Sequence, residues 1–292
     1  MRFSLAKSAG KCYTVDDKGK MKKEVGMNDG YFRLLAIGDV VGDSGTETVR
    51  RHLWSVRKEL CADLTVLNGE NAASGNGLLP ETADELFRSG ADIITGGNHT
   101  FRRRELYSYL DDCETLLRPA NYPSSCPGSG YCIRSFSGLR VLVLNLLGTV
   151  YTESLENPFE TADRILEREH GNFDLAVCDL HAEATSEKAA FAYDFDGKIT
   201  AVFGTHTHVQ TNDPTVLPNG SGFLTDLGMT GDRDSVLGVR KENVIRKFRT
   251  KMPVRFDQAT GKDTVLCGAL FTVDKNTKKT VRVELVRRTY TL

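Results

Sequence analysis

Strand-length apolar runs alternate with segments of helical periodicity along most of the chain. The runs lie at residues 34–37, 64–67, 93–95, 175–178 and 199–203. Between the first two, Val49, Leu53, Val56 and Leu60 recur at helical spacing, which predicts a helix over 46–61. A second helix is predicted to begin at Pro80 and to end near Gly90. Such alternation is typical of parallel strands joined by crossover helices.

The second half of the chain adds antiparallel strands to this pattern. Residues 118–130 are rich in Pro, Gly and Ser and are predicted to form a loop. The runs at 131–133 and 140–147 flank a Ser137-Gly138 turn, and the segments at 264–273 and 280–292 alternate as two antiparallel strands would. Helices are predicted near 162–169 and over 241–248. The fold class is therefore α/β with mixed sheets.

Residues 1–30 differ from the rest of the chain. They are polar and lysine-rich and show no sustained periodicity, which favours a disordered leader. They also lack the apolar segment of a secretory signal. We therefore predict a leader over 1–30 and a single domain over 31–292.

The composition limits the kinds of partner that the chain is expected to bind. The chain has 292 residues, 40% hydrophobic and 26% charged, which is an ordinary soluble globular balance. Its net charge of −1 provides no overall field to attract long nucleic acid. No apolar run approaches the roughly 20 residues of a membrane-spanning helix. Seven cysteines, an odd number without a Cys-x-x-Cys pair, indicate reduced thiols and a cytoplasmic protein.

Side chains that can bind metal follow the strand-like runs. They are Asp39, Glu70, Asn71, Asn98, His99, His181, His206 and His208. Four of the six histidines in the chain belong to this set. Because the carboxyl ends of parallel strands lie at one edge of a sheet, we expect these side chains to converge. Charged groups are rarely buried without partners, which favours a functional site over a structural explanation.

The donor chemistry points to a catalytic metal site. Nitrogen and oxygen donors without thiolate suit Mn, Fe, Zn or Co at an open site. The donors are too many for one tetrahedral ion, whereas two ions roughly 3.5–4 Å apart and sharing a carboxylate would use them all. Glu70 lies centrally in the inferred strand order and is the candidate bridge.

Seven motifs in this order resemble the YmdB family, a branch of the calcineurin-like metallophosphoesterases. They are Gly-Asp-Val-Val-Gly (38–42), Asn-Gly-Glu-Asn-Ala-Ala (68–73), Gly-Asn-His-Thr (97–100), Arg-Pro-Ala-Asn-Tyr-Pro (118–123), His-Ala-Glu-Ala-Thr-Ser-Glu-Lys (181–188), Gly-Thr-His-Thr-His-Val-Gln-Thr (204–211) and Asp-Leu-Gly-Met-Thr-Gly (226–231). The similarity extends from about residue 31 to the C-terminus. The wider superfamily has a histidine at position 41, an aspartate at position 70 and an acidic residue at position 100, where this chain has Val41, Glu70 and Thr100.

The resemblance implies a four-layer α-β-β-α sandwich with mixed sheets and a metal site at the C-terminal ends of the strands, so that 31–292 is the catalytic domain. It implies two divalent metal ions, with iron or manganese favoured and zinc or cobalt as alternatives. One ion would be held by Asp39, Glu70, Asn71 and His208, and the other by Glu70, Asn98, His181 and His206. His99 would be the general acid that protonates the leaving oxygen.

The implied function is a phosphodiesterase that hydrolyses 2′,3′-cyclic nucleotides by in-line attack of a metal-bridging hydroxide. The alternatives are a phosphomonoesterase or protein phosphatase, and a metal-dependent regulatory, RNA-associated protein whose hydrolysis is incidental. The expected partner is a small phosphorylated substrate rather than a membrane, and homo-oligomerisation stays open. Asp179 and Glu183 are candidates to orient His181. Arg118 and Asn121 are candidates to contact phosphate or to form a salt bridge within their loop.

Overall fold

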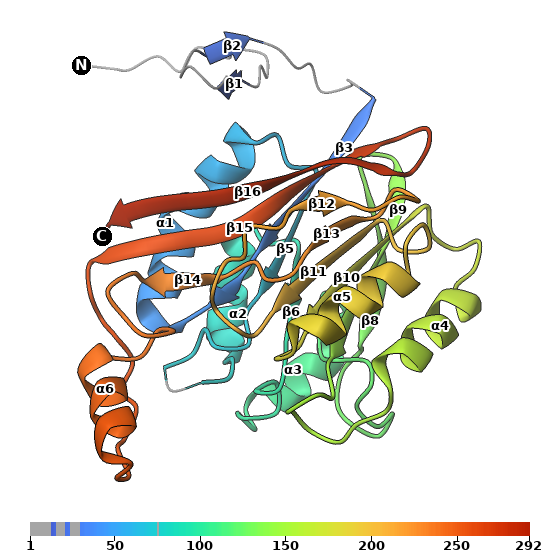
Figure 1. Ribbon diagram of the computed structural model, residues 1–292. Coiled ribbons are helices and arrows are strands. Elements are labelled where there is room, and N and C mark those ends of the chain that lie inside the picture. The colour runs from blue at the N-terminus through green and yellow to red at the C-terminus, as the bar shows by residue number, and fades with distance from the viewer. Residues whose placement is uncertain (1–12, 16–20, 24–29, 75) are drawn as a thin grey trace.

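The computed structural model describes residues 13–15, 21–23, 30–74 and 76–292 (Figure 1). Within the predicted leader, β1 (Tyr13–Val15) and β2 (Met21–Lys23) form an antiparallel pair. The other residues of 1–29 lie outside the described part, so the disordered leader stays a prediction.

The larger sheet has eight strands. They are, in order, β4 (Asp39–Val40), β14 (Met229–Asp232), β15 (Asp263–Asp274), β3 (Tyr31–Ile37), β5 (Leu64–Asn68), β6 (Ile93–Thr95) and β7 (Leu116–Leu117), with β16 (Thr280–Thr291) paired to β15. β3, β5, β6 and β7 are parallel neighbours. The helices α1 (Gly42–Glu59), α2 (Pro80–Arg88) and α3 (Leu106–Asp112) connect them in turn. The predicted crossover units are confirmed, as is the antiparallel pair at the C-terminus.

The smaller sheet has six strands. They are, in order, β12 (Thr215–Val216), β13 (Gly222–Leu224), β11 (Ala201–Thr205), β10 (Leu175–His181), β9 (Leu139–Leu147) and β8 (Tyr131–Phe136). β8 and β9 form the predicted hairpin, and β9, β10, β11 and β13 run parallel. Two helices, α4 (Pro158–Arg168) and α5 (Thr185–Asp194), cover this sheet, and α6 (Lys241–Thr250) lies at one end of the molecule (Figure 1).

Buried apolar side chains form three layers of core. In β3, Leu34 and Ala36 pack toward the smaller sheet, whereas Leu35 and Ile37 pack toward the helices, as the two-residue period of a strand requires. The layer between the sheets also contains Phe203 of β11. The third layer lies between the smaller sheet and its helices. The molecule is thus a four-layer α-β-β-α sandwich, which confirms the expected fold.

Two features differ from the sequence-based expectations. Helix α5 was not predicted, because its buried side carries Lys188 beside Phe191 and Ala192 and so shows little apolar periodicity. Cys61 is disulfide-bonded, which corrects the expectation that all thiols are reduced. Among the described cysteines, the free thiols are Cys113, Cys126, Cys132, Cys178 and Cys267. Within the described ranges, no helix is both long and apolar enough to cross a membrane.

Candidate metal centre

The ends of β3, β5 and β6 deliver oxygen donors to one edge of the larger sheet. Asp39 follows β3 and is fully buried, and Glu70 follows β5 and is 2% exposed. Asn98 follows β6 and lies at the same edge, since β3, β5 and β6 are parallel neighbours. The smaller sheet contributes imidazoles from the matching end, because His181 ends β10 and pairs with Thr205 at the end of β11.

Three potential ligand atoms surround the Nε2 atom of His181. Asn98 Oδ1 lies 3.1 Å from it, Glu70 Oε1 3.3 Å and His206 Nδ1 3.0 Å. Ligands at about 2.0–2.2 Å from one ion are separated by distances of this size. The spacing therefore suits a cation that would take the place of the direct contacts between these atoms.

A second group of donors lies on the other side of Glu70. Its Oε1 atom accepts a hydrogen bond of 2.8 Å from Asn71 Nδ2, which is 3.3 Å from His208 Nε2. His208 Nε2 lies 3.6 Å from Asp39 Oδ1, a buried oxygen without a hydrogen-bond partner in the described part of the chain. An orphaned carboxylate oxygen beside imidazole and amide groups fits a cation, provided that the Asn71 amide turns to present Oδ1. The structure thus brings together all seven predicted ligands.

The buried carboxylates and imidazoles of the cluster shift one another's pKa values. Burial alone would raise the pKa of Glu70, but His181 and His99 bring it well below its usual value. Burial opposes the protonation of His181, yet Glu70 and Asp39 raise its pKa to about 9. A cation bound at this site would compete with a proton for His181 Nε2.

A hydroxyl connects His181 to a buried carboxylate. His181 Nδ1 and Thr205 Oγ1 are 2.8 Å apart, and Thr205 Oγ1 donates to Asp179 Oδ1 at 2.7 Å. Burial raises the pKa of Asp179 to about 6. These hydrogen bonds from Asp179 through Thr205 fix the imidazole ring so that Nε2 faces Glu70. Histidines that bind metal are usually oriented by such a contact at their other ring nitrogen. Asp179 thus reaches His181 through Thr205, whereas Glu183 contacts His206 Nε2 at 3.1 Å instead of His181.

The loop that carries His206 and His208 is held in an unusual conformation. Their φ angles are 97° and 63°, in the left-handed region that non-glycine residues seldom adopt. Thr207, between them, donates to Asp226 Oδ2 through its backbone N at 3.2 Å and through its hydroxyl at 2.8 Å. Asp226 in turn accepts from Lys188 Nζ at 2.8 Å, and both side chains are fully buried. Sequence reasoning did not single out this ion pair.

We expect Lys188→Met to destabilise the protein by about 3–5 kcal/mol, because it leaves the Asp226 carboxylate buried without its counter-charge. Urea denaturation monitored by circular dichroism measures this free energy of unfolding. Lys198→Met is the matched control, since Lys198 pairs with Asp163 on the surface at 3.5 Å and should cost less than about 1 kcal/mol. Equal losses in the two variants would contradict a buried, loop-holding role for Lys188.

Gly97 permits the close approach of the two sheets at the cluster. A Cβ atom at this position would lie 2.5 Å from His181 Nε2 and closer still to the Glu70 carboxylate. We expect Gly97→Ala to displace these side chains and to reduce the affinity for metal by at least about tenfold. Isothermal titration with Mn²⁺ measures the change. At Gly138, an added Cβ would meet no atom within 4 Å. Gly138→Ala should cost some stability, because φ is 83° there, but should leave the affinity for metal unchanged.

His99 lies at the rim of the cluster. Its backbone N donates to Glu70 Oε2 at 3.0 Å, and its Nδ1 lies 3.0 Å from Glu70 Oε1. The side chain is 28% exposed, and no described residue makes a hydrogen bond with its Nε2. The geometry therefore leaves one ring nitrogen open toward solvent, beside a buried group of potential ligands.

The sandwich and the cluster at its strand ends together define the class of this chain as a metallophosphoesterase-type hydrolase. The fold is shared with a 5′-nucleotidase structure from Staphylococcus aureus, with a TM-score of 0.58 at 14% identity over 88% of this chain and 54% of that chain. Residues 35–286 match the family described as YmdB-like protein, so the chain belongs to the YmdB-like family. This confirms the resemblance.

Two relatives carry names that describe an activity. A 2′,3′-cyclic-nucleotide 2′-phosphodiesterase from Bacillus subtilis is 42% identical over 87% of this chain and 96% of its own length. The crystal structure of a phosphatase from Mycoplasma pneumoniae has a TM-score of 0.84 and 33% identity, over 89% of this chain and 94% of that chain. The chain is accordingly a phosphoric ester hydrolase, as predicted.

Proposed function

We propose that this chain hydrolyses 2′,3′-cyclic nucleotides with two divalent cations, iron or manganese. The observation that carries the proposal is the position of Glu70 Oε1, which lies within 3.3 Å both of His181 Nε2 and of Asn71 Nδ2. A carboxylate shared in this way suits two adjacent cations. The Bacillus subtilis relative, named for cleavage of 2′,3′-cyclic nucleotides, supports the choice of substrate.

The seven donors would divide around Glu70. Asp39, Asn71 and His208 would complete one cation site, and Asn98, His181 and His206 the other. When bound, two such cations lower the pKa of a water and offset the charge that builds on the phosphoryl oxygens. The burial of Asp39, Glu70 and His181 keeps bulk water away from these groups and would strengthen the attraction between the carboxylates and the cations.

His99 would act as the general acid. Its Nδ1 contact with Glu70 fixes the ring and leaves Nε2 to give a proton. In the reaction, a water oxygen forms a bond to phosphorus and the bond between phosphorus and O2′ breaks. The proton from His99 goes to O2′, so that the product is a nucleoside 3′-phosphate.

The test is a comparison of substrates. Purified protein with added Mn²⁺ or Fe²⁺ is assayed on 2′,3′-cAMP, 3′,5′-cAMP and a phosphomonoester, and chelator-treated protein is the control. We expect metal-dependent turnover with 2′,3′-cAMP as the best substrate. Faster turnover of the monoester would instead favour a phosphomonoesterase, the candidate that the name of the Mycoplasma pneumoniae structure supports.

A further inference from the structure

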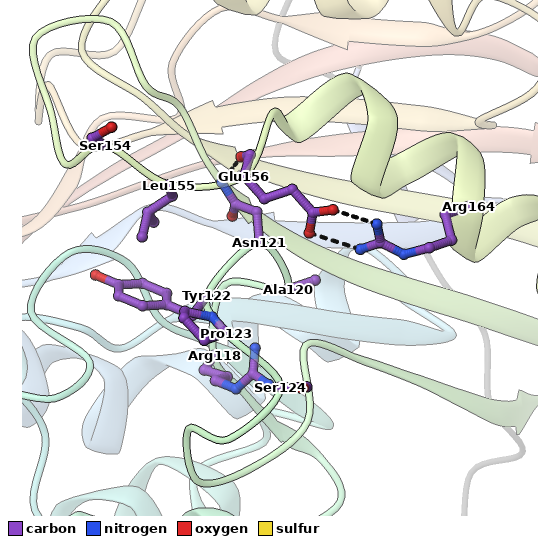
Figure 2. Close-up of a pocket in the computed structure, with 10 residues that line it drawn as sticks. All are labelled: Arg118, Ala120, Asn121, Tyr122, Pro123, Ser124, Ser154, Leu155, Glu156 and Arg164. Carbon is purple, nitrogen blue, oxygen red and sulfur yellow. Dashed lines mark hydrogen bonds and ion pairs between the residues drawn. The ribbon is translucent and has the colours of Figure 1, made fainter.

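A cavity of about 490 Å³ lies between the loop at 118–124 and the loop at 154–156 (Figure 2). Its lining includes Arg118, Asn121, Tyr122, Leu155, Glu156 and Arg164. Neither His99 nor any of the seven proposed ligands is among them. The cavity is nevertheless close to the cluster, because Phe101, two residues after His99, packs edge-on against Tyr122 with ring centroids 5.1 Å apart.

Arg118 is the cation of this cavity that has no counter-charge. It is only 6% exposed, and its Nη1 donates to the Pro119 carbonyl at 2.8 Å. Its Nε has no hydrogen-bond partner, and no described carboxylate lies within ion-pair distance of its guanidinium. Burial accordingly lowers the pKa of Arg118. A buried charge without a partner is costly, so its presence calls for a ligand.

The other charged groups of the cavity are already paired. Glu156 and Arg164 face each other at its rim, with Arg164 Nη2 donating at 2.9 Å (Figure 2). The Tyr122 hydroxyl donates to Glu153 at 3.0 Å. Arg118 is therefore the group best able to attract an anion into the cavity.

The cavity is held in shape by hydrogen bonds from the Asn121 side chain to the backbone of the loop at 154–156 and of β9. Asn121 Nδ2 donates to the carbonyls of Leu147 and Glu156 at 2.8 and 3.0 Å, and Asn121 Oδ1 accepts from the Leu147 N–H at 2.9 Å. Leu147 pairs in register with His181, so the same contacts tie the loop to the edge of the sheet that carries the cluster. The Asn121 amide is occupied by the backbone, which leaves Arg118 as the phosphate contact of the two candidates.

We propose that this cavity binds a second phosphate group of the nucleotide substrate through Arg118, with Tyr122 and Leu155 against the nucleoside. The inference rests on the proposed function. Because the phosphate that is cleaved must lie at the cation sites, the phosphate at Arg118 must be a different one. An arginine fork matches the oxygens of a phosphate and can bind two of them. The preferred substrate class is a 2′,3′-cyclic nucleotide that also carries a 5′-phosphate.

The test compares adenosine 2′,3′-cyclic phosphate with the same compound bearing a 5′-phosphate. For the unaltered protein we expect a KM about 10- to 100-fold lower for the 5′-phosphorylated compound, the effect of a charge-assisted hydrogen bond. Arg118→Met should reduce this preference to about twofold. The KM of the unphosphorylated compound should change much less than the KM of the 5′-phosphorylated one. Arg164→Met is the matched control and should keep the preference, since its guanidinium is engaged by Glu156.

Thermal unfolding separates a binding role from a structural one. Arg118→Met should melt at the same or a higher temperature than the unaltered protein, since it removes an unpaired buried charge. Should Arg118→Met fail to fold, Arg118→Gln gives the same test and retains a donor for the Pro119 carbonyl. Three outcomes would each overturn the inference. The unaltered protein could show equal KM values for the two compounds, or Arg118→Met could keep the preference for the 5′-phosphorylated one. Arg118→Met could also lower kcat equally on both compounds.

A protein that hydrolyses neither compound would contradict the proposed function, and the cavity is then tested by binding alone. Calorimetric titration of the unaltered protein should show tighter binding of adenosine 5′-monophosphate than of adenosine. Arg118→Met should bind the two equally. Equal binding by the unaltered protein would overturn the inference by a route that does not depend on hydrolysis.

Discussion

Glu70→Gln is expected to abolish hydrolysis of 2′,3′-cyclic nucleotides, with kcat falling by at least about 10³-fold. The side chain is buried and its Oε1 faces both groups of donors, so loss of its charge weakens both cation sites at once. The two side chains have the same shape, so the fold should be retained. Measurement of kcat together with bound metal per chain by mass spectrometry checks the result.

Glu183→Gln is the control for this substitution. Glu183 also contacts the cluster, through His206 Nε2 at 3.1 Å, but its side chain is 51% exposed and touches one histidine. We expect less than about a tenfold loss of kcat, as for groups that support a ligand without being one. A Glu70→Gln protein that kept turnover within tenfold of the unaltered protein would show that no carboxylate bridge is needed.

His99→Ala is expected to keep its metal and lose turnover. General acid catalysis contributes about 10²–10⁴-fold, and the kcat on 2′,3′-cAMP should fall by that factor. The loss should be much smaller on a p-nitrophenyl ester, since that leaving group departs without a proton. This difference between substrates is the signature of a proton donor.

The control for this experiment is His170→Ala, at an exposed histidine outside the cluster, which should leave both kcat values unchanged. Bound metal is measured in each variant. A parallel fall of metal content and turnover in His99→Ala would mean that His99 is a ligand, and the general-acid assignment would be wrong.

Hydrophobic periodicity and the order of the motifs predict the fold class and the proposed ligands because those ligands directly follow strands. The run at 34–37 predicts a strand, and Asp39 beyond it can only lie at the end of that strand. Chemistry that depends on tertiary partners was not accessible in the same manner. Lys188 and Asp226 pair across 38 residues, and neither the motif that ends at Lys188 nor the one that begins at Asp226 indicates this pairing. The lysine also breaks the apolar pattern of α5, which is why that helix was not predicted.

The same limit applies to Arg118. The Arg-Pro-Ala-Asn-Tyr-Pro stretch identifies a loop, but a sequence does not show which arginine lacks a carboxylate. Arg164 has Glu156 at hand and Arg118 has none, a contrast that depends on how the loops at 118–124 and 154–156 fold over each other. The sequence likewise leaves Asn121 open between a phosphate contact and a contact within its loop, whereas in the fold its amide holds the backbone of Leu147.

The candidate metal centre draws its donors from opposite halves of the sandwich, with Asp39, Glu70 and Asn98 on one sheet and His181, His206 and His208 on the other. Cations bound there would link the two sheets directly. Every tenfold excess of metal over its dissociation constant would add about 1.4 kcal/mol to folding. Removal of the metal would thus lower the free energy of unfolding as well as the activity.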